Sequence, residues 1–374
     1  MRTVDAAGLK IGDEYPPRIM GVLNVSEESP YDPSVFADPG EAAAYVDEEL
    51  IDEGADIVDV GLESANKRFE VLSAEEELER LETAIETLES TSGDAVWSIE
   101  TRYHEVAAAA LESGFEMVND ICGFADPEMP AVCADYDVAV SKMASPPDLQ
   151  RPGAIEDVDG IYEALERNGF TEKTILDPAF GGWSEGKTTA DDRETFDRLR
   201  EFRGYGRPIL VSINRKNFLR EIAGRDTEAA LPASLAATSM AVERGAHVVR
   251  THDVAATRDA ALVGHEFTQK RFRADDIAEL DVTTDRELAR HLGRISAGID
   301  DPAEMTHAVE IPPSNGAIPQ IAETAGRVGL AVFRGEGLVL AGTVREFEAL
   351  SASIEGPATD AIARLCEGLG ASDA

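Results

Sequence analysis

Basic residues are scarce in this sequence. It holds 34 lysines and arginines against 73 aspartates and glutamates, a formal net charge of −39 at pH 7, and only seven of the basic residues are lysine. Nucleic acids and anionic membranes are held mainly through Lys and Arg, so we expect neither as a partner. The acids are dispersed along the chain, which suits a protein kept soluble in concentrated salt. We interpret the charge as halophilic adaptation, with an ordinary acidic cytosolic enzyme as the alternative.

Cysteine pairs and long hydrophobic runs are also missing. The three cysteines, Cys122, Cys133 and Cys366, form no CxxC motif, which argues against a zinc ribbon or a disulfide scaffold. The first 17 residues contain no apolar core of signal-peptide type, and no stretch approaches about 18 apolar residues. These absences predict a cytoplasmic protein that does not span a membrane.

What the chain does contain is a regular alternation of short apolar runs and amphipathic segments. Each of the eight runs reads as a buried strand, and a helical pattern follows most of them. The predicted strands are 18–25, 56–61, 96–100, 116–120, 138–142, 174–178, 208–213 and 247–251, and the main predicted helices are 41–54, 73–90, 104–114, 191–206, 231–246 and 255–267. Eight strand–helix units in about 250 residues predict a (β/α)8 TIM barrel, with a doubly wound sheet as the runner-up.

Polar residues stand at or just after the carboxyl ends of nearly all these strands, and this favours the barrel. In a barrel those ends converge on one mouth, where active sites lie. The residues concerned are Asn24, Glu63, Glu100, Asn119, Asp177, Lys216, Arg250 and His252.

The remaining chain, 275–374, is predicted to form a small C-terminal α/β domain after a barrel that ends near residue 270. Helices are expected around 285–296 and 316–327, separated by a proline-containing break at 312–313. A hairpin is expected over 328–344 because its turn reads Arg-Gly-Glu-Gly. We find no chemistry in this part of the sequence.

Six segments that carry the strand-end residues resemble, in the same order, the motifs of the dihydropteroate synthase family. They are IMGVLNVS (19–26), DIVDVGLES (56–64), 98–124, ILDPAFG (175–181), INRKNF (213–218) and VRTHDV (249–254). The resemblance covers roughly residues 15–270. It implies a pterin-binding barrel that condenses (7,8-dihydropterin-6-yl)methyl diphosphate with p-aminobenzoate, an arylamine, and releases diphosphate in folate biosynthesis. The family commonly forms homodimers, so a homodimer is expected too.

The resemblance also suggests how the pterin would be held. A pterin presents a flat edge with a 2-amino group and a ring N–H, and a buried carboxylate such as Asp177 can accept both hydrogen bonds. Asn119 can donate and accept at the adjacent edge. Glu100 stands where the family has Asp and is expected to face the ring, and Lys216 can donate to the ring carbonyl or a ring nitrogen.

The diphosphate and the second substrate need other groups. Arg250 and His252 alternate on the last strand and therefore point the same way, so both are expected to stabilise the leaving diphosphate. Asn24 is expected to help hold Mg²⁺, which prefers oxygen ligands. Asn214 is expected to open the following helix, whose backbone N–H groups would take the benzoate carboxylate. We assign Lys216, Arg250 and His252 to catalysis, with C–O cleavage preceding attack by the arylamine.

Three other readings of these residues stay open. A pterin-dependent methyltransferase would also use Asn119 and Asp177, but it has no diphosphate to bind. A non-catalytic pterin-binding paralogue would fit the departures from the family pattern in the loops 26–34 and 63–68. GGWSEGKT (181–188) matches the phosphate-binding loop of nucleotide-binding folds, although that motif normally opens its domain and here follows the sixth strand.

Overall fold

The chain folds into two compact units, residues 1–270 and 271–374, which are described separately below. The computed structural model describes residues 1–26, 34–63, 71–181, 186–271, 273–274, 277–278, 280–295, 306–311, 318–334, 338–354, 362–363 and 366. Over these residues, none of the helices combines the length and the apolar character needed to cross a membrane.

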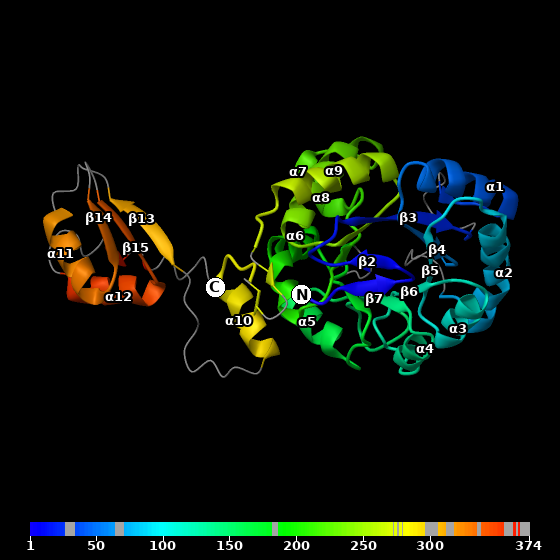
Figure 1. The fold of residues 1–374 in the computed structure, drawn as a ribbon, viewed down its shortest axis with the longest axis horizontal. Coiled ribbons are helices and arrows are strands. Elements are labelled where there is room, and N and C mark those ends of the chain that lie inside the picture. Colours follow the sequence, from blue (N-terminus) through cyan, green and yellow to red (C-terminus); the bar gives the residue numbers. More distant parts are fainter. Residues whose placement is uncertain are drawn as a thin grey trace. The chain divides into compact units, whose positions relative to one another are not determined.

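Unit 1 is a barrel of eight parallel strands surrounded by helices (Figure 1). The hydrogen-bonded order is β8-β7-β6-β5-β4-β3-β10-β9, and a parallel bridge between Leu176 and Ile209 joins the two end strands. This closure confirms the predicted barrel and rules out the open doubly wound sheet. The strands are β3 (Arg18–Asn24), β4 (Ile57–Gly61), β5 (Val96–Thr101), β6 (Met117–Asp120), β7 (Ala139–Met143), β8 (Thr174–Asp177), β9 (Leu210–Val211) and β10 (Val248–Thr251).

Four helices of unit 1, the first, second, fifth and sixth, begin at side-chain caps. Ser73 and Glu76 form a capping box at the start of the second helix, and Asp38 accepts two backbone N–H bonds at the start of the first. The helices are α1 (Pro39–Tyr45), α2 (Ala74–Ser90), α3 (His104–Glu112), α4 (Met129–Asp135), α5 (Val158–Glu166), α6 (Thr189–Asp197), α7 (Asn217–Ala223), α8 (Leu231–Glu243) and α9 (Val254–Phe267). Two predicted helices are split: a π-helical segment, Val46–Ile51, continues α1, and a 3₁₀ segment, Leu199–Tyr205, follows α6.

An N-terminal hairpin, absent from the sequence predictions, covers the bottom of the barrel. Its strands are β1 (Val4–Ala6) and β2 (Leu9–Ile11), and its two turn residues, Ala7 and Gly8, both have positive φ. The hairpin packs on a layer to which every barrel strand gives one apolar side chain. Those side chains are Met20, Ile57, Val96, Met117, Ala139, Ile175, Leu210 and Val248.

The interior becomes polar two residues further along most strands, because alternate residues of a strand face the same side, although on β3 the buried Val22 follows Met20. On β4 the next inward residue after Ile57 is Asp59, on β6 the residue after Met117 is Asn119, and on β10 Arg250 follows Val248. The barrel therefore has an apolar bottom and a polar middle layer. The apolar side chains of the bottom layer are buried and stabilise the fold, and the middle layer places polar groups below the mouth.

Unit 2 contains a three-stranded antiparallel sheet in the order β13-β15-β14. The predicted hairpin corresponds to its strands β14 and β15, although turn residues 335–337 and the break at 312–313 lie outside the described residues. Leu338, Leu340 and Phe347 are among the buried side chains of its core. The elements are β11 (Arg273–Ala274), β12 (Ile277–Ala278), α10 (Asp285–Arg294), β13 (His307–Ile311), α11 (Ile318–Val328), β14 (Ala331–Arg334), β15 (Leu338–Gly342) and α12 (Val344–Ser353).

The hairpin should contribute to stability by closing the apolar layer. We expect Ile11→Ala, which truncates a fully buried side chain of β2, to lower the free energy of unfolding by roughly 2–4 kcal/mol. Ile222→Ala is the control, because Ile222 is 63% exposed and the same truncation there should change stability by about 0.5 kcal/mol or less. Chemical denaturation measures both, and equal effects would contradict this role of the hairpin.

Candidate active site

A buried carboxylate, Asp59, organises the middle layer of the barrel. It has no exposed surface, and three side chains from other strands donate hydrogen bonds to it. Ser98 Oγ lies 2.7 Å from Oδ1, while Asn119 Nδ2 and Arg250 Nε lie 2.9 and 2.7 Å from Oδ2. Asp59 thus fixes the orientation of Asn119 and Arg250, two of the predicted site residues.

Arg250 also joins Glu100 to this layer. Its Nη2 donates to Glu100 Oε2 at 2.7 Å. Burial raises the pKa of Glu100, and the guanidinium opposes that rise. The two bonds use two of the five N–H groups of Arg250, so the other three have no acceptor among the residues that the structure describes.

Asp177 and Lys216 lie in the same part of the barrel. Asp177 ends β8, and its Oδ1 accepts the Ala179 N–H at 2.8 Å. Burial raises the pKa of Asp177 to about 6 against the opposing influence of Lys216 and Arg250. Burial and Arg250 lower the pKa of Lys216 to about 8. At neutral pH the carboxylate is therefore mostly ionised and the amine mostly protonated.

Lys216 reaches this place because a glycine leaves room for it. Gly181 has φ +115°, and a Cβ there would stand 2.9 Å from Lys216 Nζ. The neighbouring Arg215 has φ +52° and is held by two hydrogen bonds of 2.8 Å to the carboxylate of Asp253. The chain therefore turns sharply before Lys216, which caps α7.

Asn24 and His252 lie at the rim, linked through Ser34. Asn24 Nδ2 donates to Ser34 Oγ at 3.0 Å, and Ser34 Oγ lies 3.1 Å from His252 Nδ1. Burial and Arg250 lower the pKa of His252 to about 3, so its imidazole is neutral at pH 7. A Cβ on Gly61 would stand 2.9 Å from Asn24 Oδ1 and 3.7 Å from Glu100 Oε1, so an amide oxygen and a carboxylate oxygen both border this glycine.

One sequence-based expectation, the role of Asn214, needs correction. Asn214 does not open a helix: α7 begins at Asn217, and Asn214 Nδ2 donates instead to Asp253 at 2.9 Å. Residues 182–185 of the GxxxxGKT segment lie outside the described residues, but the Lys187 that follows them does not offer its amine to a phosphate. The Lys187 Nζ is buried, donates to Ala179 O and lies 3.6 Å from Asp192, while Thr188 forms the capping box of α6.

Most of the two divergent loops, 26–34 and 63–68, lies within residues 27–33 and 64–70, which are outside the described residues. The ends of the second loop are described. Glu63 Oε1 accepts the Leu72 N–H at 3.0 Å, and Glu63 Oε2 pairs with the buried Arg102. Arg102 in turn donates to Leu149 O at 2.7 Å. Glu63 and Arg102 therefore fix both ends of this loop to the barrel.

Sequence reasoning missed Asp59, Ser98 and Arg102. Asp59 lies within an apolar run, and Ser98 is a residue type common in strands, so neither was predicted to belong to the site. The alternation of DIVDVG does place Asp59 on the same face as Ile57 and Gly61, which was the available signal. For Arg102 the sequence offered no comparable signal.

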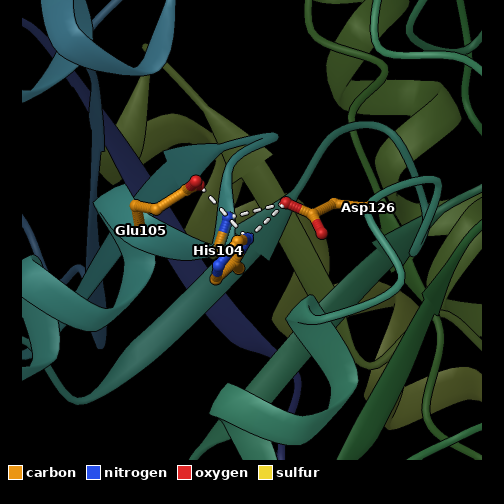
Figure 2. Close-up of side chains that lie close together, drawn as sticks. All are labelled: His104, Glu105 and Asp126. Carbon is orange, nitrogen blue, oxygen red and sulfur yellow. Dashed lines mark hydrogen bonds and ion pairs between the residues drawn. The ribbon is translucent and has the colours of Figure 1, made fainter.

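A separate cluster lies at the start of α3 and is shown in Figure 2. His104 Nδ1 lies 2.8 Å from Asp126 Oδ2 and 3.2 Å from Glu105 Oε2. The three ligand atoms lie within 4.8 Å of one another, as metal ligands can. Asp126 also accepts the backbone N–H groups of His104 and Glu128, so the cluster is explained as an ion-paired helix cap.

Comparison with known proteins gives the class of protein that this barrel represents. The family described as pterin binding enzyme matches residues 20–252, which include every strand of the barrel. The chain therefore belongs to the pterin-binding enzymes, and its most similar relatives narrow this to the dihydropteroate synthase family.

Two relatives and one solved structure support that narrower placement. Dihydropteroate synthase from Clostridium beijerinckii is 33% identical over 65% of this chain and 91% of its own length. A probable bifunctional folylpolyglutamate synthase/dihydropteroate synthase from Haloferax volcanii is 34% identical over 70% of this chain, which spans only 33% of that relative. A Coxiella burnetii dihydropteroate synthase solved with pteroic acid has a TM-score of 0.60 and 27% identity, covering 71% of this chain and 98% of its own.

The ion pair at α3 predicts a pH-dependent contribution to stability. Asp126 raises the pKa of His104 above its usual 6.5, so the contribution is fully present below pH 6.5 and is lost as the pH rises through the folded-state pKa. We expect the difference in unfolding free energy between wild type and His104→Gln to be larger at pH 6 than at pH 8.5.

Denaturation at the two pH values measures this difference. His265→Gln, at an exposed position of α9, is the control and should stay close to wild type at both. A difference for His104→Gln that does not change with pH would contradict the ion pair.

Proposed function

We propose that the protein is a dihydropteroate synthase, joining (7,8-dihydropterin-6-yl)methyl diphosphate to p-aminobenzoate with release of diphosphate. The observation that carries this proposal is the convergence of Asn119, Asp177, Lys216 and Arg250 in one barrel interior. Pteroic acid, bound in the Coxiella relative, contains both the pterin and the aminobenzoate. The relatives reported above are synthases, which favours this reaction over the methyltransferase alternative.

Asp177 and Asn119 would hold the pterin. The ionised Asp177 accepts hydrogen bonds from the 2-amino group and the ring N–H of the pterin, and it does so from a buried site where such bonds are strong. Asn119 is oriented by Asp59 and meets the adjacent edge. Lys216 donates to the ring carbonyl or a ring nitrogen, and Glu100 borders the ring.

Hydrogen-bond donors on the other side would stabilise the leaving group. Arg250 keeps three N–H groups beyond its bonds to Asp59 and Glu100, and neutral His252 can donate one N–H to a phosphate oxygen. Breakage of the C–O bond releases diphosphate and leaves a pterin-methyl cation. The arylamine nitrogen then forms the C–N bond and loses a proton to solvent, so a strong general base is not required. Asn214 would lie beside this second substrate.

The rim residues fit a bound Mg²⁺. Asn24 offers an amide oxygen, and Glu100 offers a carboxylate oxygen near the same glycine, which is the oxygen donor set that Mg²⁺ prefers. When bound there, the ion would neutralise charge on the diphosphate.

The cellular location and the oligomeric state of the enzyme are also proposals. A dispersed net charge of −39 supports a salt-adapted cytoplasm. The exposed Leu262, Val263 and Phe267 on α9 support a homodimer, because apolar patches on a surface mark association sites. The family match ends at residue 252, so we assign the pterin chemistry to the barrel and none to the domain that follows it.

Turnover tests the proposed function directly. We expect the full-length protein, in high-KCl buffer with Mg²⁺, to release diphosphate only when the pterin diphosphate and p-aminobenzoate are both supplied. A chelator should stop the reaction, and fresh Mg²⁺ should restore it. Pterin binding without any diphosphate release would support the non-catalytic paralogue instead.

Asp177→Asn tests how the pterin is held. The substitution removes a buried charge that accepts two hydrogen bonds, so pterin affinity measured by calorimetry should fall by roughly 2–4 kcal/mol. Because the pKa of Asp177 is about 6, wild-type affinity should also weaken as the pH falls through that value, whereas the variant should lack this dependence. Unchanged affinity in the variant would remove Asp177 from the site.

A further inference from the structure

Ser141 occupies the middle layer of the barrel next to the residues expected to bind the pterin. It lies on β7 between Ala139, which belongs to the apolar bottom, and Met143, which lies in an apolar cluster with Ile121 and Ala179. Its partner in the β6–β7 register is Asn119. Paired residues of parallel strands face the same side, so the Ser141 side chain points into the barrel as Asn119 does.

The hydroxyl of Ser141 is buried without a hydrogen bond. The residue has no exposed surface, and its Oγ has no hydrogen-bond partner among the residues that the structure describes. Ser98, another fully buried serine of this layer, differs in this respect because its Oγ donates to Asp59 at 2.7 Å. The two serines therefore form a matched pair: one is bonded within the protein and one is not.

A buried polar group without a partner destabilises the folded protein. Such groups are rare and usually have a ligand or an ordered water as partner. On β6 the register partner of Ser141 is the polar Asn119, whereas on β8 it is Ile175, and Asp177 follows two residues later as the partner of Met143. The hydroxyl therefore lacks the kind of partner that a heterocycle edge, or one water beneath it, could supply.

We propose that Ser141 is a specificity-determining residue for the pterin, supplying a hydrogen bond, direct or through one water, to the most enclosed edge of the bound ring. This inference rests on the proposed function, since it assumes that the pterin binds against Asn119 and Asp177. It adds to that function a neutral group that can both donate and accept. The hydroxyl, which has no partner among the described residues, gains one on binding.

The experiment compares Ser141→Ala with Ser98→Ala in the full-length protein. Calorimetry with 6-hydroxymethylpterin and thermal unfolding without ligand are measured for both. For Ser141→Ala we expect roughly three- to ten-fold weaker pterin binding with a Tm equal to or above that of wild type. For Ser98→Ala we expect a Tm lower by roughly 2–6 °C, because Asp59 loses a donor.

Each outcome decides one question. Equal pterin affinity of wild type and Ser141→Ala overturns the inference, as does a loss of Tm in Ser141→Ala as large as that in Ser98→Ala, which would mean a structural hydroxyl. Ser141→Cys, which keeps the volume and a weak donor, should bind with intermediate affinity. If wild type itself binds no pterin, the proposed function fails, and this result is distinguishable from failure of the serine alone.

Discussion

The barrel interior depends on one interaction, the acceptance of three hydrogen bonds by the buried carboxylate of Asp59. An isolated ionised carboxylate in such a place would strongly destabilise the fold. Donors on β5, β6 and β10, namely Ser98, Asn119 and Arg250, compensate for its desolvation. Because these donors come from three other strands, the carboxylate also holds the barrel in one register. The same bonds orient the groups that would meet the pterin.

Stability and chemistry are separated along the barrel axis. The bottom layer has one apolar side chain from each strand, packed against the N-terminal hairpin. Its packing does not involve the residues at the mouth. The middle layer concentrates charges that a core would ordinarily exclude, and burial shifts the pKa of Asp177 and of Lys216 toward neutrality. Such shifts are typical of functional sites. The free energy gained by burying the apolar bottom layer offsets the cost of burying polar groups in the middle layer.

Strand-end polarity predicted part of the site, whereas the linear GxxxxGKT motif did not identify a further part. Asn119, Asp177 and Arg250 were recognised because parallel strands carry their carboxyl ends to one mouth, and the structure brings them into one interior. Lys187 illustrates the opposite case. Its motif suggested phosphate binding, but its amine is buried against Ala179 and Asp192. A linear motif records the spacing of residue types and not the direction in which a side chain points.

By itself the sequence determined the architecture, because eight short apolar runs separated by amphipathic helices bury their surface well as a closed parallel barrel. Tertiary structure alone decided which polar groups would meet. Asp59 and Arg250 are 191 residues apart and become partners only when the barrel closes and sets the strand register. Pairing of this kind depends on three-dimensional registration across several strands, and no local pattern of residues encodes it.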